Sequence, residues 1–334
     1  MQASNFNKVD HKDSHNKRRA MLLSTYPAIK NLMGYDAKQA LPVLIIVPLQ
    51  IGLARYFSMV HHADNGCIGY WIILFLFIYM VGAILTHWLA MAIHETSHHL
   101  VFKQEWQNRC LALLANIPIV IPFAMSFHKY HNHSDVEKNA VSADWSSIDV
   151  SMTTTIRLRK IVWWLLSPFF YLLRGLLNAT KPNRWEILNV VLMGITTALL
   201  ALYVGWVGIL YLLLCAYVGM GPHPVAAHFI QGHVWFGQEN LSYYGPLNEV
   251  SYNIGYRNEH YDFMNIPSSR LPRLKAMLNE EYEYLASHHS WTMVLWDYIA
   301  GKKKKVPSKE TRPKIDFFED KRGYLQQWTY CDFY

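Results

Sequence analysis

His94 and His98 are four residues apart in the stretch His-Glu-Thr-Ser-His, where a long apolar segment gives way to polar sequence. If residues 81–99 form one continuous helix, the two imidazoles lie one above the other on the same face. A helix fixes the separation of such nitrogen ligands before a metal ion arrives. Because polar groups at the end of a membrane span are costly and tend to be functional, the pair predicts a metal site.

Three later groups of histidines lie in polar sequence and can complete such a site. The groups are His128, His131 and His133; His223, His228 and His233; and His260, which lies between Glu259 and Asp262. The ends of helices in a bundle can bring residues from all of them together. Several imidazoles with a few carboxylates suit iron better than magnesium or calcium.

The composition indicates a membrane protein. Of the 334 residues, 52% are hydrophobic and 16% charged, whereas soluble chains have about 25% charged residues. The net charge of +7 comes from basic residues beside apolar segments, which favours a membrane surface and not nucleic acid as the partner. The four cysteines are scattered and indicate neither a disulfide framework nor a thiolate metal site.

The apolar segments predict an all-α integral membrane fold with four transmembrane helices. Residues 41–60 and 68–93 each form one span, and residues 68–93 contain no Asp, Glu, Lys or Arg. Residues 187–220 are too long for one span and have glycines near the middle, so we expect a helical hairpin. Residues 110–127 and 161–177 contain prolines and suit interfacial or re-entrant segments better than full crossings.

The distribution of basic residues predicts the topology. Lys and Arg are concentrated in the N-terminal segment, in residues 128–160 and 181–184, and in the C-terminal third, whereas residues 54–67 contain only Arg55. By the positive-inside rule both termini and all histidine groups face the cytosol, where they form a histidine-rich cap. We expect a cytosolic N-terminal segment (1–40), a membrane domain (41–300) and a basic C-terminal tail (301–334).

Six stretches in order resemble the sphingolipid delta-4 desaturases, also called dihydroceramide desaturases, of the membrane fatty-acid-desaturase superfamily. They are RRAMLLSTYPAIK at 18–30, HETSH at 94–98, SFHKYH at 126–131, His223-Pro224 with HFI at 228–230, YYGPLN at 243–248, and NEHYDFMNIP at 258–267. The resemblance implies a multi-pass protein of the endoplasmic reticulum with a di-iron centre. It also implies that the protein inserts a trans double bond into the sphingoid base of dihydroceramide, a membrane lipid. The reaction would use oxygen and electrons from cytochrome b5.

The resemblance also implies a set of site residues. His94, His98, His131, His228 and His260 are the expected metal ligands. Any of them except the first pair can instead be a hydrogen-bonded structural histidine. Further ligands, or side chains that orient the ligands, are His99, His128, His133, Asp135, His233, Glu259 and Asp262. We expect His87 to bond a neighbouring helix and Asn265 to help support His260.

The sequence departs from the histidine boxes of that family. The family has one H-x-x-x-H box and two H-x-x-H-H boxes, and only the first is intact here. Four of the eight box histidines are replaced, by Ser134, Asp135, Arg257 and Tyr261. Arginine is always protonated and cannot bind a metal ion, and serine is a poor ligand. We therefore expect desaturation to be weak or lost.

Three alternatives remain open from the sequence. His99, His128, His133 and Asp135 can repair the damaged boxes. The chain can instead be a non-catalytic pseudo-desaturase that binds a sphingolipid or a partner. Residues 94–98 also satisfy H-E-x-x-H, in which two histidines hold zinc and Glu95 acts as the general base of a membrane protease. The sequence leaves open whether an active site of this kind would desaturate or hydroxylate its substrate.

Overall fold

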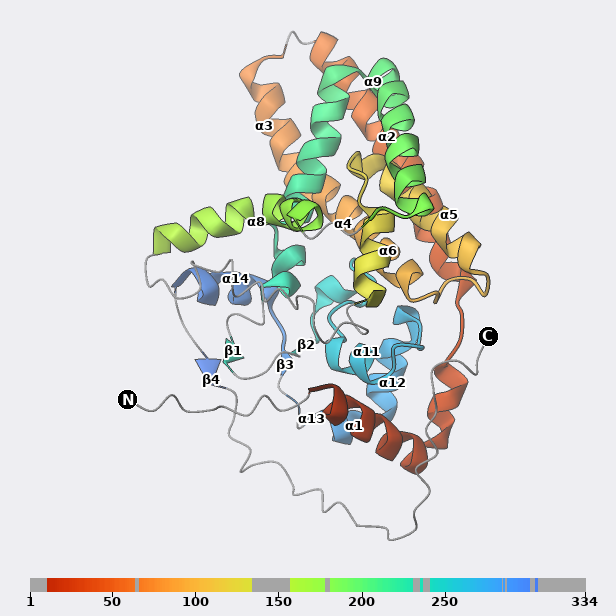
Figure 1. Ribbon diagram of the computed structural model, residues 1–334. Coiled ribbons are helices and arrows are strands. Elements are labelled where there is room, and N and C mark those ends of the chain that lie inside the picture. The colour runs from red at the N-terminus through yellow and green to blue at the C-terminus, as the bar shows by residue number, and fades with distance from the viewer. Residues whose placement is uncertain are drawn as a thin grey trace.

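The computed structural model describes residues 11–63, 66–133, 157–177, 181–230, 235–236, 241–283, 285, 287–300 and 304–305. Nearly all regular structure in these residues is helical. Figure 1 shows long helices grouped at one end of the molecule and shorter elements gathered at the other. Two pairs of short parallel strands lie among the shorter elements. β1 (Trp235–Phe236) pairs with β4 (Lys304–Lys305), and β2 (Ser242–Tyr243) pairs with β3 (Ser287–His288).

Among the described residues, three helical stretches are long and apolar enough to cross a membrane. The first, Ala37–Ala63, consists of the short helix η2 (Ala37–Gln39) and α2 (Ala40–Ala63). The second, Ile68–Ser97, joins α3 (Ile68–Phe77), the π-helical turn η3 (Ile78–Gly82) and α4 (Ala83–Ser97). The third is α9 (Arg184–Gly219). The helical character predicted for all three apolar segments is confirmed.

Gly205 interrupts α9 near its middle. Its backbone angles, φ 72° and ψ 177°, lie in a region that is essentially restricted to glycine. A Cβ atom at this position would meet Ser58 Oγ of α2 at 3.0 Å. Figure 1 shows α9 reversing direction at the far end of the bundle. The break falls in the segment that the sequence predicts to be a hairpin.

A buried polar network holds α4 against α2 and α9. The Gln50 side chain of α2 donates to Gly82 O at 2.9 Å and to Thr86 Oγ1 at 2.8 Å. The Tyr211 hydroxyl of α9 donates to Gln50 Oε1 at 2.7 Å. His87 Nδ1 lies 2.8 Å from Gly219 O, so this histidine bonds a neighbouring helix as predicted. Except for His87 Nε2, which has no hydrogen-bond partner among the described residues, these groups satisfy one another away from water, so the network fixes the helix that carries the first histidine box.

A tight turn connects α5 (Glu105–Asn116) to α6 (Ala124–His133) through the short helix η4 (Ile117–Ile119). The Asn116 carboxamide holds this turn: its oxygen accepts from the backbone N–H of Phe123 and Ala124 at 3.1 and 2.9 Å, and its nitrogen donates to Ile121 O at 2.6 Å. The segment predicted to be re-entrant or interfacial therefore contains a helix, a turn and the start of a second helix. The turn directs α6 back toward α4.

Helix α8 (Arg157–Leu177) lies across the direction of the long helices in Figure 1. It remains one helix through Pro168. Its exposed apolar side chains include Leu158, Val162, Leu166 and Phe169, which recur at helical spacing along one face. The interfacial position of residues 161–177 stays a prediction.

The remaining elements pack below the bundle and include the N-terminal segment. Helix α1 (His11–Thr25) and the short helix η1 (Pro27–Leu32) share a buried apolar cluster with residues 263–282. Leu22, Ile29, Phe263 and Tyr282 are all almost completely buried there. The other elements are η5 (Pro224–Phe229), η6 (Pro246–Asn248), α11 (Arg257–Asp262), η7 (Ser268–Arg270), α12 (Leu271–Met277), α13 (Asn279–Glu283) and α14 (Trp291–Ala300).

Candidate metal centre

His94 and His98 lie at the C-terminal end of α4. The helix ends at Ser97, two residues before the end of the continuous helix considered from the sequence. His98 is the C-cap, and His99 has a positive φ of 56°, which turns the chain away from the helix axis. The rings of His94 and His98 nevertheless face each other, with centroids 4.8 Å apart. The predicted pairing of the two side chains is therefore present.

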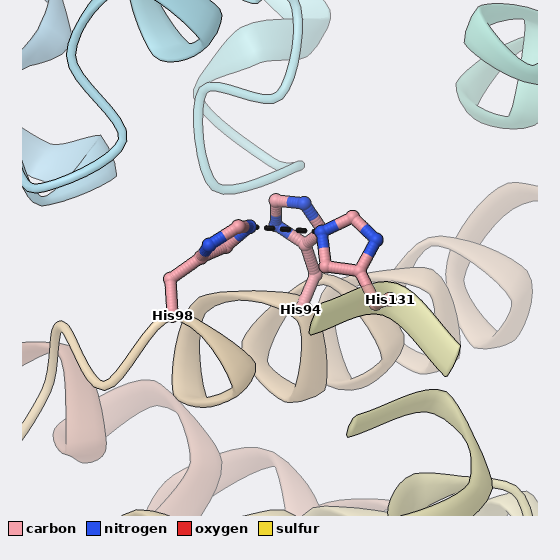
Figure 2. A group of neighbouring side chains, drawn as sticks. All are labelled: His94, His98 and His131. Carbon is pink, nitrogen blue, oxygen red and sulfur yellow. Dashed lines mark hydrogen bonds between the residues drawn. The ribbon is translucent and has the colours of Figure 1, made fainter. Parts of the chain in front are cut away.

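His131 of α6 joins this pair. Its Nε2 atom lies 2.8 Å from His98 Nε2, and its ring centroid is 4.7 Å from that of His94. Phe127, one turn earlier in α6, stacks on the His131 ring at 4.8 Å and fixes its orientation. One nitrogen from each of the three histidines lies within 4.8 Å of the other two. Figure 2 shows the three rings pointing toward one another from two helices.

His260 of α11 contacts the same group. Its ring centroid is 5.1 Å from that of His94 and 4.8 Å from that of His98. The neighbouring Glu259 accepts hydrogen bonds from Ser242 Oγ at 2.8 Å and from the Tyr244 hydroxyl at 2.5 Å. These bonds anchor one face of the short helix α11. Four imidazoles from three helices therefore converge; they are called the histidine cluster below.

Burial favours the neutral form of His260 and His98 in the histidine cluster. Desolvation, together with the neighbouring His131 and Arg257, lowers the pKa of His260 to about 3. Desolvation and the surrounding histidines also lower the pKa of His98 well below its ordinary value. Neutral imidazole is the form that binds metal ions. A set of nitrogen donors in this protonation state fits one transition-metal ion such as iron or zinc.

His228 lies in a separate contact with His87. The two ring centroids are 5.3 Å apart, and His228 Nδ1 lies 3.0 Å from the carbonyl oxygen of Val225. Desolvation and the neighbouring His87 lower the pKa of His228 well below its ordinary value. In the described part of the chain, metal-ligand atoms gather in one group, His94, His98 and His131. Neither His228 nor His260 belongs to this group of three, but the His260 ring contacts His94 and His98 whereas the His228 ring contacts His87.

Arg257 of α11 lies close to both His228 and His260. Its guanidinium is 3.4 Å from His228 O and 3.5 Å from the Tyr261 hydroxyl, and its charge acts on both histidines. The Nε atom of Arg257 is buried and has no hydrogen-bond partner among the described residues. A permanent positive charge at this place opposes a second cation beside His228. Among the described residues, the atoms that could hold a metal ion gather in one group.

The other residues that the sequence suggested as ligands or supporting groups lie outside the histidine cluster or outside the described residues. His128 Nε2 lies 3.1 Å from Thr96 Oγ1, and desolvation lowers the pKa of His128 to about 3. His99 is half-buried beyond the end of α4. Asp262 accepts hydrogen bonds from Arg18 and Tyr282. The side chain of His133, and residues Ser134, Asp135 and His233, lie outside the described residues.

Glu95 of the H-E-x-x-H stretch is buried and hydrogen-bonded. Its Oε1 atom accepts from Gln39 Nε2 at 2.7 Å and from the backbone N–H of Ser268 at 2.8 Å. Gln39 comes from the N-terminal segment, and Ser268 follows the stretch that carries His260. The carboxylate therefore joins three parts of the chain, a structural role that the sequence analysis missed.

Arg18 is a second residue whose role the sequence analysis missed. Its Nε and Nη2 atoms donate to Asp262 Oδ2 and Oδ1, both at 2.7 Å, across 244 positions of sequence. Arg18 lies in the stretch RRAMLLSTYPAIK, which resembles the family although it is far from the histidines in sequence. A resemblance at such a place indicates a structural role, and it could have pointed to this arginine.

Comparison with known proteins supports one family over almost the whole chain. The family "Fatty acid desaturase" matches residues 69–292, and the family "Sphingolipid Delta4-desaturase" matches residues 2–38. The chain belongs to the sphingolipid delta-4 desaturases. Relatives of this family include sphingolipid delta(4)-desaturase DES1 of Drosophila melanogaster, which is 38% identical over 89% of this chain and 92% of its own length.

Two other sphingolipid delta-4 desaturases show how widely the likeness extends. Sphingolipid delta(4)-desaturase DES1-like of Arabidopsis thaliana is 37% identical over 86% of this chain and 85% of its own length. Sphingolipid delta(4)-desaturase/C4-monooxygenase DES2 of Homo sapiens is 37% identical over 89% of this chain and 91% of its own length. The resemblance read from the sequence is therefore confirmed. The fatty acid desaturase family implies a di-iron site, and the histidine cluster is where this chain could hold metal.

Proposed function

We propose that this sphingolipid delta-4 desaturase family member holds one metal ion in the histidine cluster and has weak or no desaturase activity. His94, His98, His131 and His260 would bind the ion. The proposal rests chiefly on Arg257, which supplies a fixed positive charge close to both His260 and His228. Iron bound by the histidine cluster would supply redox chemistry. The protein's own residues hold the imidazoles neutral, in place and away from water.

The membrane setting belongs to the same proposal. We infer four crossings, with α9 contributing two of them on either side of Gly205, and with the histidine cluster and both termini on the cytosolic side. The contacts of Gly205 and Tyr203 with α2 support this arrangement: a Cβ atom at Gly205 would meet Ser58, and Arg55 Nη1 donates to Tyr203 O at 3.0 Å. From the family we infer that the protein resides in the membrane of the endoplasmic reticulum. We also infer that its substrate is a dihydroceramide-like lipid and that cytochrome b5 is its electron donor.

The test is complementation combined with metal analysis. The chain is expressed in cells that lack dihydroceramide desaturase, and conversion of labelled dihydroceramide is followed by mass spectrometry. The Drosophila relative, expressed to the same level, is the positive control. We expect ceramide near background and about one metal ion per purified chain. Full conversion by a chain with two irons would contradict the proposal, and a 4-hydroxylated product would assign monooxygenation, which the printed name of the human relative includes.

A non-catalytic sphingolipid-binding protein is the second candidate. The replaced box positions favour it, because a lipid-binding scaffold needs no second metal ion. The His94→Ala variant separates the two readings. A pseudo-desaturase retains binding of dihydroceramide and its cellular effect after this change, whereas a metal-dependent activity is lost.

The zinc protease alternative has less support. A general base must reach the water that it activates. The Glu95 carboxylate instead accepts hydrogen bonds from Gln39 and Ser268 and connects parts of the fold. Zinc in place of iron, together with metal-dependent cleavage of a membrane-protein substrate, would restore this alternative.

A further inference from the structure

The N-terminal segment contacts α11 beside His260. The Arg18 guanidinium binds both carboxylate oxygens of Asp262 at 2.7 Å, and Tyr282 donates to the same carboxylate at 3.0 Å. Asp262 is only 1% exposed and lies two residues after His260. A buried carboxylate that loses its cation is strongly destabilised. The position of α11 therefore depends on Arg18.

The same segment contacts α4 beside His94. Gln39 Nε2 donates to Glu95 Oε1 at 2.7 Å, and Gln39 Oε1 accepts from Ser268 Oγ at 2.8 Å. Glu95 directly follows His94 and also accepts from the backbone N–H of Ser268. The Gln39 side chain therefore connects the first histidine box to the chain that follows the third.

Between these two contacts the N-terminal segment stays attached to the region that follows His260. Gly34 N donates to Asn265 O at 3.1 Å. The Arg270 guanidinium donates to the carbonyl oxygens of Leu32 and Tyr35, both at 3.0 Å. These bonds, with the buried apolar cluster around Leu22, leave little freedom between Arg18 and Gln39.

We propose that residues 18–39 form a brace that sets the position of His260 relative to His94, with Arg18 and Gln39 as positioning residues. Arg18 acts through Asp262, and Gln39 acts through Glu95 and Ser268. Helix α11 has only six residues and cannot hold His260 by its own rigidity. Its other face is fixed by Glu259, so loss of Arg18 leaves the Asp262 side of α11 held by the Tyr282 hydrogen bond alone. The proposal rests on the one-metal site proposed above.

The first test compares metal affinity in two variants of α1. Arg18→Ala removes the contact to Asp262, whereas Lys17→Ala removes one positive charge from an exposed neighbour on the same helix. Purified proteins in detergent are titrated with Co²⁺, whose visible absorption reports the number of nitrogen ligands. We expect Arg18→Ala to weaken Co²⁺ binding about 10-fold, the loss typical of residues that orient ligands, and Lys17→Ala to leave it unchanged. Equal affinity in both variants would overturn the brace.

A second test needs no metal. Diethyl pyrocarbonate modifies accessible imidazoles, and mass spectrometry reports the rate at each histidine. We expect His260 to react several-fold faster in Arg18→Ala than in Lys17→Ala, while exposed His289 and fully buried His87 react at unchanged rates. Faster reaction of His87 as well would mean general unfolding and would contradict a positioning role. Unchanged reaction of His260 would also overturn the brace.

The double variant Arg18→Ala with Asp262→Asn tests whether Arg18 acts through Asp262. Because the amide removes the unpaired buried charge, we expect it to recover part of the Co²⁺ affinity and to slow modification of His260. An additive loss in the double variant would contradict this route. If the unaltered protein binds no Co²⁺, the one-metal proposal fails, while His260 reactivity still decides the brace.

Discussion

The Nε2 atom of His131 lies 2.8 Å from the Nε2 atom of His98, although the two residues belong to different helices. At this separation the two nitrogens contact each other directly, and a metal ion bound to both would lie to one side of the line that joins them. The hydrogen bond shows that the turn at Asn116 and the end of α4 are adjusted to one another. Two distant pieces of sequence thus meet at one ligand position.

His98→Ala is expected to abolish metal retention. The variant removes one of three nitrogens that lie within 4.8 Å of one another, which should cost more than the about 10 to 100-fold that a supporting residue costs. Metal content is measured on purified protein by mass spectrometry. The control is His61→Ala, whose ring packs on Trp71 and Trp206 far from the site. Equal metal content in the two variants would remove the case for the histidine cluster.

Restoring the family histidines is expected to restore a second metal position. The fourfold change Ser134→His, Asp135→His, Arg257→His and Tyr261→His should raise iron content toward two per chain and increase ceramide formation. Arg257→His alone removes the cation without completing either box, so we expect it to change little. A native chain that already holds two irons, and a fourfold variant that loses activity, would indicate a rearranged ligand set instead.

The metal-free protein is expected to lose stability on acidification. Burial lowers the pKa of His223 to about 4 and that of His128 to about 3, whereas both titrate near 6.5 when unfolded. Below pH 6.5 the unfolded chain binds more protons, so the free energy of unfolding falls with pH, by about 1 kcal/mol per group at pH 5.5.

Melting temperatures in detergent at pH 7.5 and 5.5 measure this effect. The difference should be smaller in His223→Gln, and exposed His289→Gln should leave it unchanged. A melting temperature that rises on acidification would show that these histidines are not buried as neutral groups.

Gly205→Val is expected to destabilise the bundle. The backbone conformation of Gly205 is costly for other residues, by about 1 to 3 kcal/mol, and the new side chain would meet Ser58. Gly194→Val is the matched control, because it lies in a helical part of α9 and a Cβ there meets no atom within 4 Å. Thermal unfolding in detergent compares the two variants. Equal melting temperatures would contradict the conformation found at Gly205.

Epitope tags are expected to report a cytosolic site. Tags at both termini and within residues 134–156 should be digested by protease added to intact microsomes, whereas a tag between Ala63 and Cys67 should be protected. The reason is the bias of basic residues toward the segments that flank the histidine groups. Protection of the tag in residues 134–156 would separate His131 from the cytosolic face and overturn the single-site arrangement.

Local features of the sequence were sufficient to predict part of the site. The spacing of His94 and His98 predicts that the two side chains pair, and the apolar segments predict the helices of the bundle. His131 and His260 required the family resemblance, because nothing local places α6 or α11 against α4. The separation of His228 from the histidine cluster was not predictable, since it depends on how η5 packs against His87.

The contacts that support the histidine cluster could not be predicted from the sequence. Glu95 reads as a catalytic base in an H-E-x-x-H pattern, and only the fold shows that Gln39 and Ser268 occupy its carboxylate. The π-helical turn at residues 78–82 has no signal in an uninterrupted apolar segment. By contrast, Gly205 was noticeable because glycine in a segment too long for one span indicates a turn.

The contact between Arg18 and Asp262 also has a consequence for biogenesis. At about 5 to 20 residues per second, the ribosome needs about 10 to 50 s to make the 244 positions that separate the two residues. During that time α1 has been synthesised but its partner surface has not, and the apolar side chains of Leu22 and Ile29 have nothing to cover them. The four-histidine cluster is complete only after residue 260 of the 334 has been made, and a premature stop anywhere before Asp262 leaves an N-terminal helix that lacks this partner.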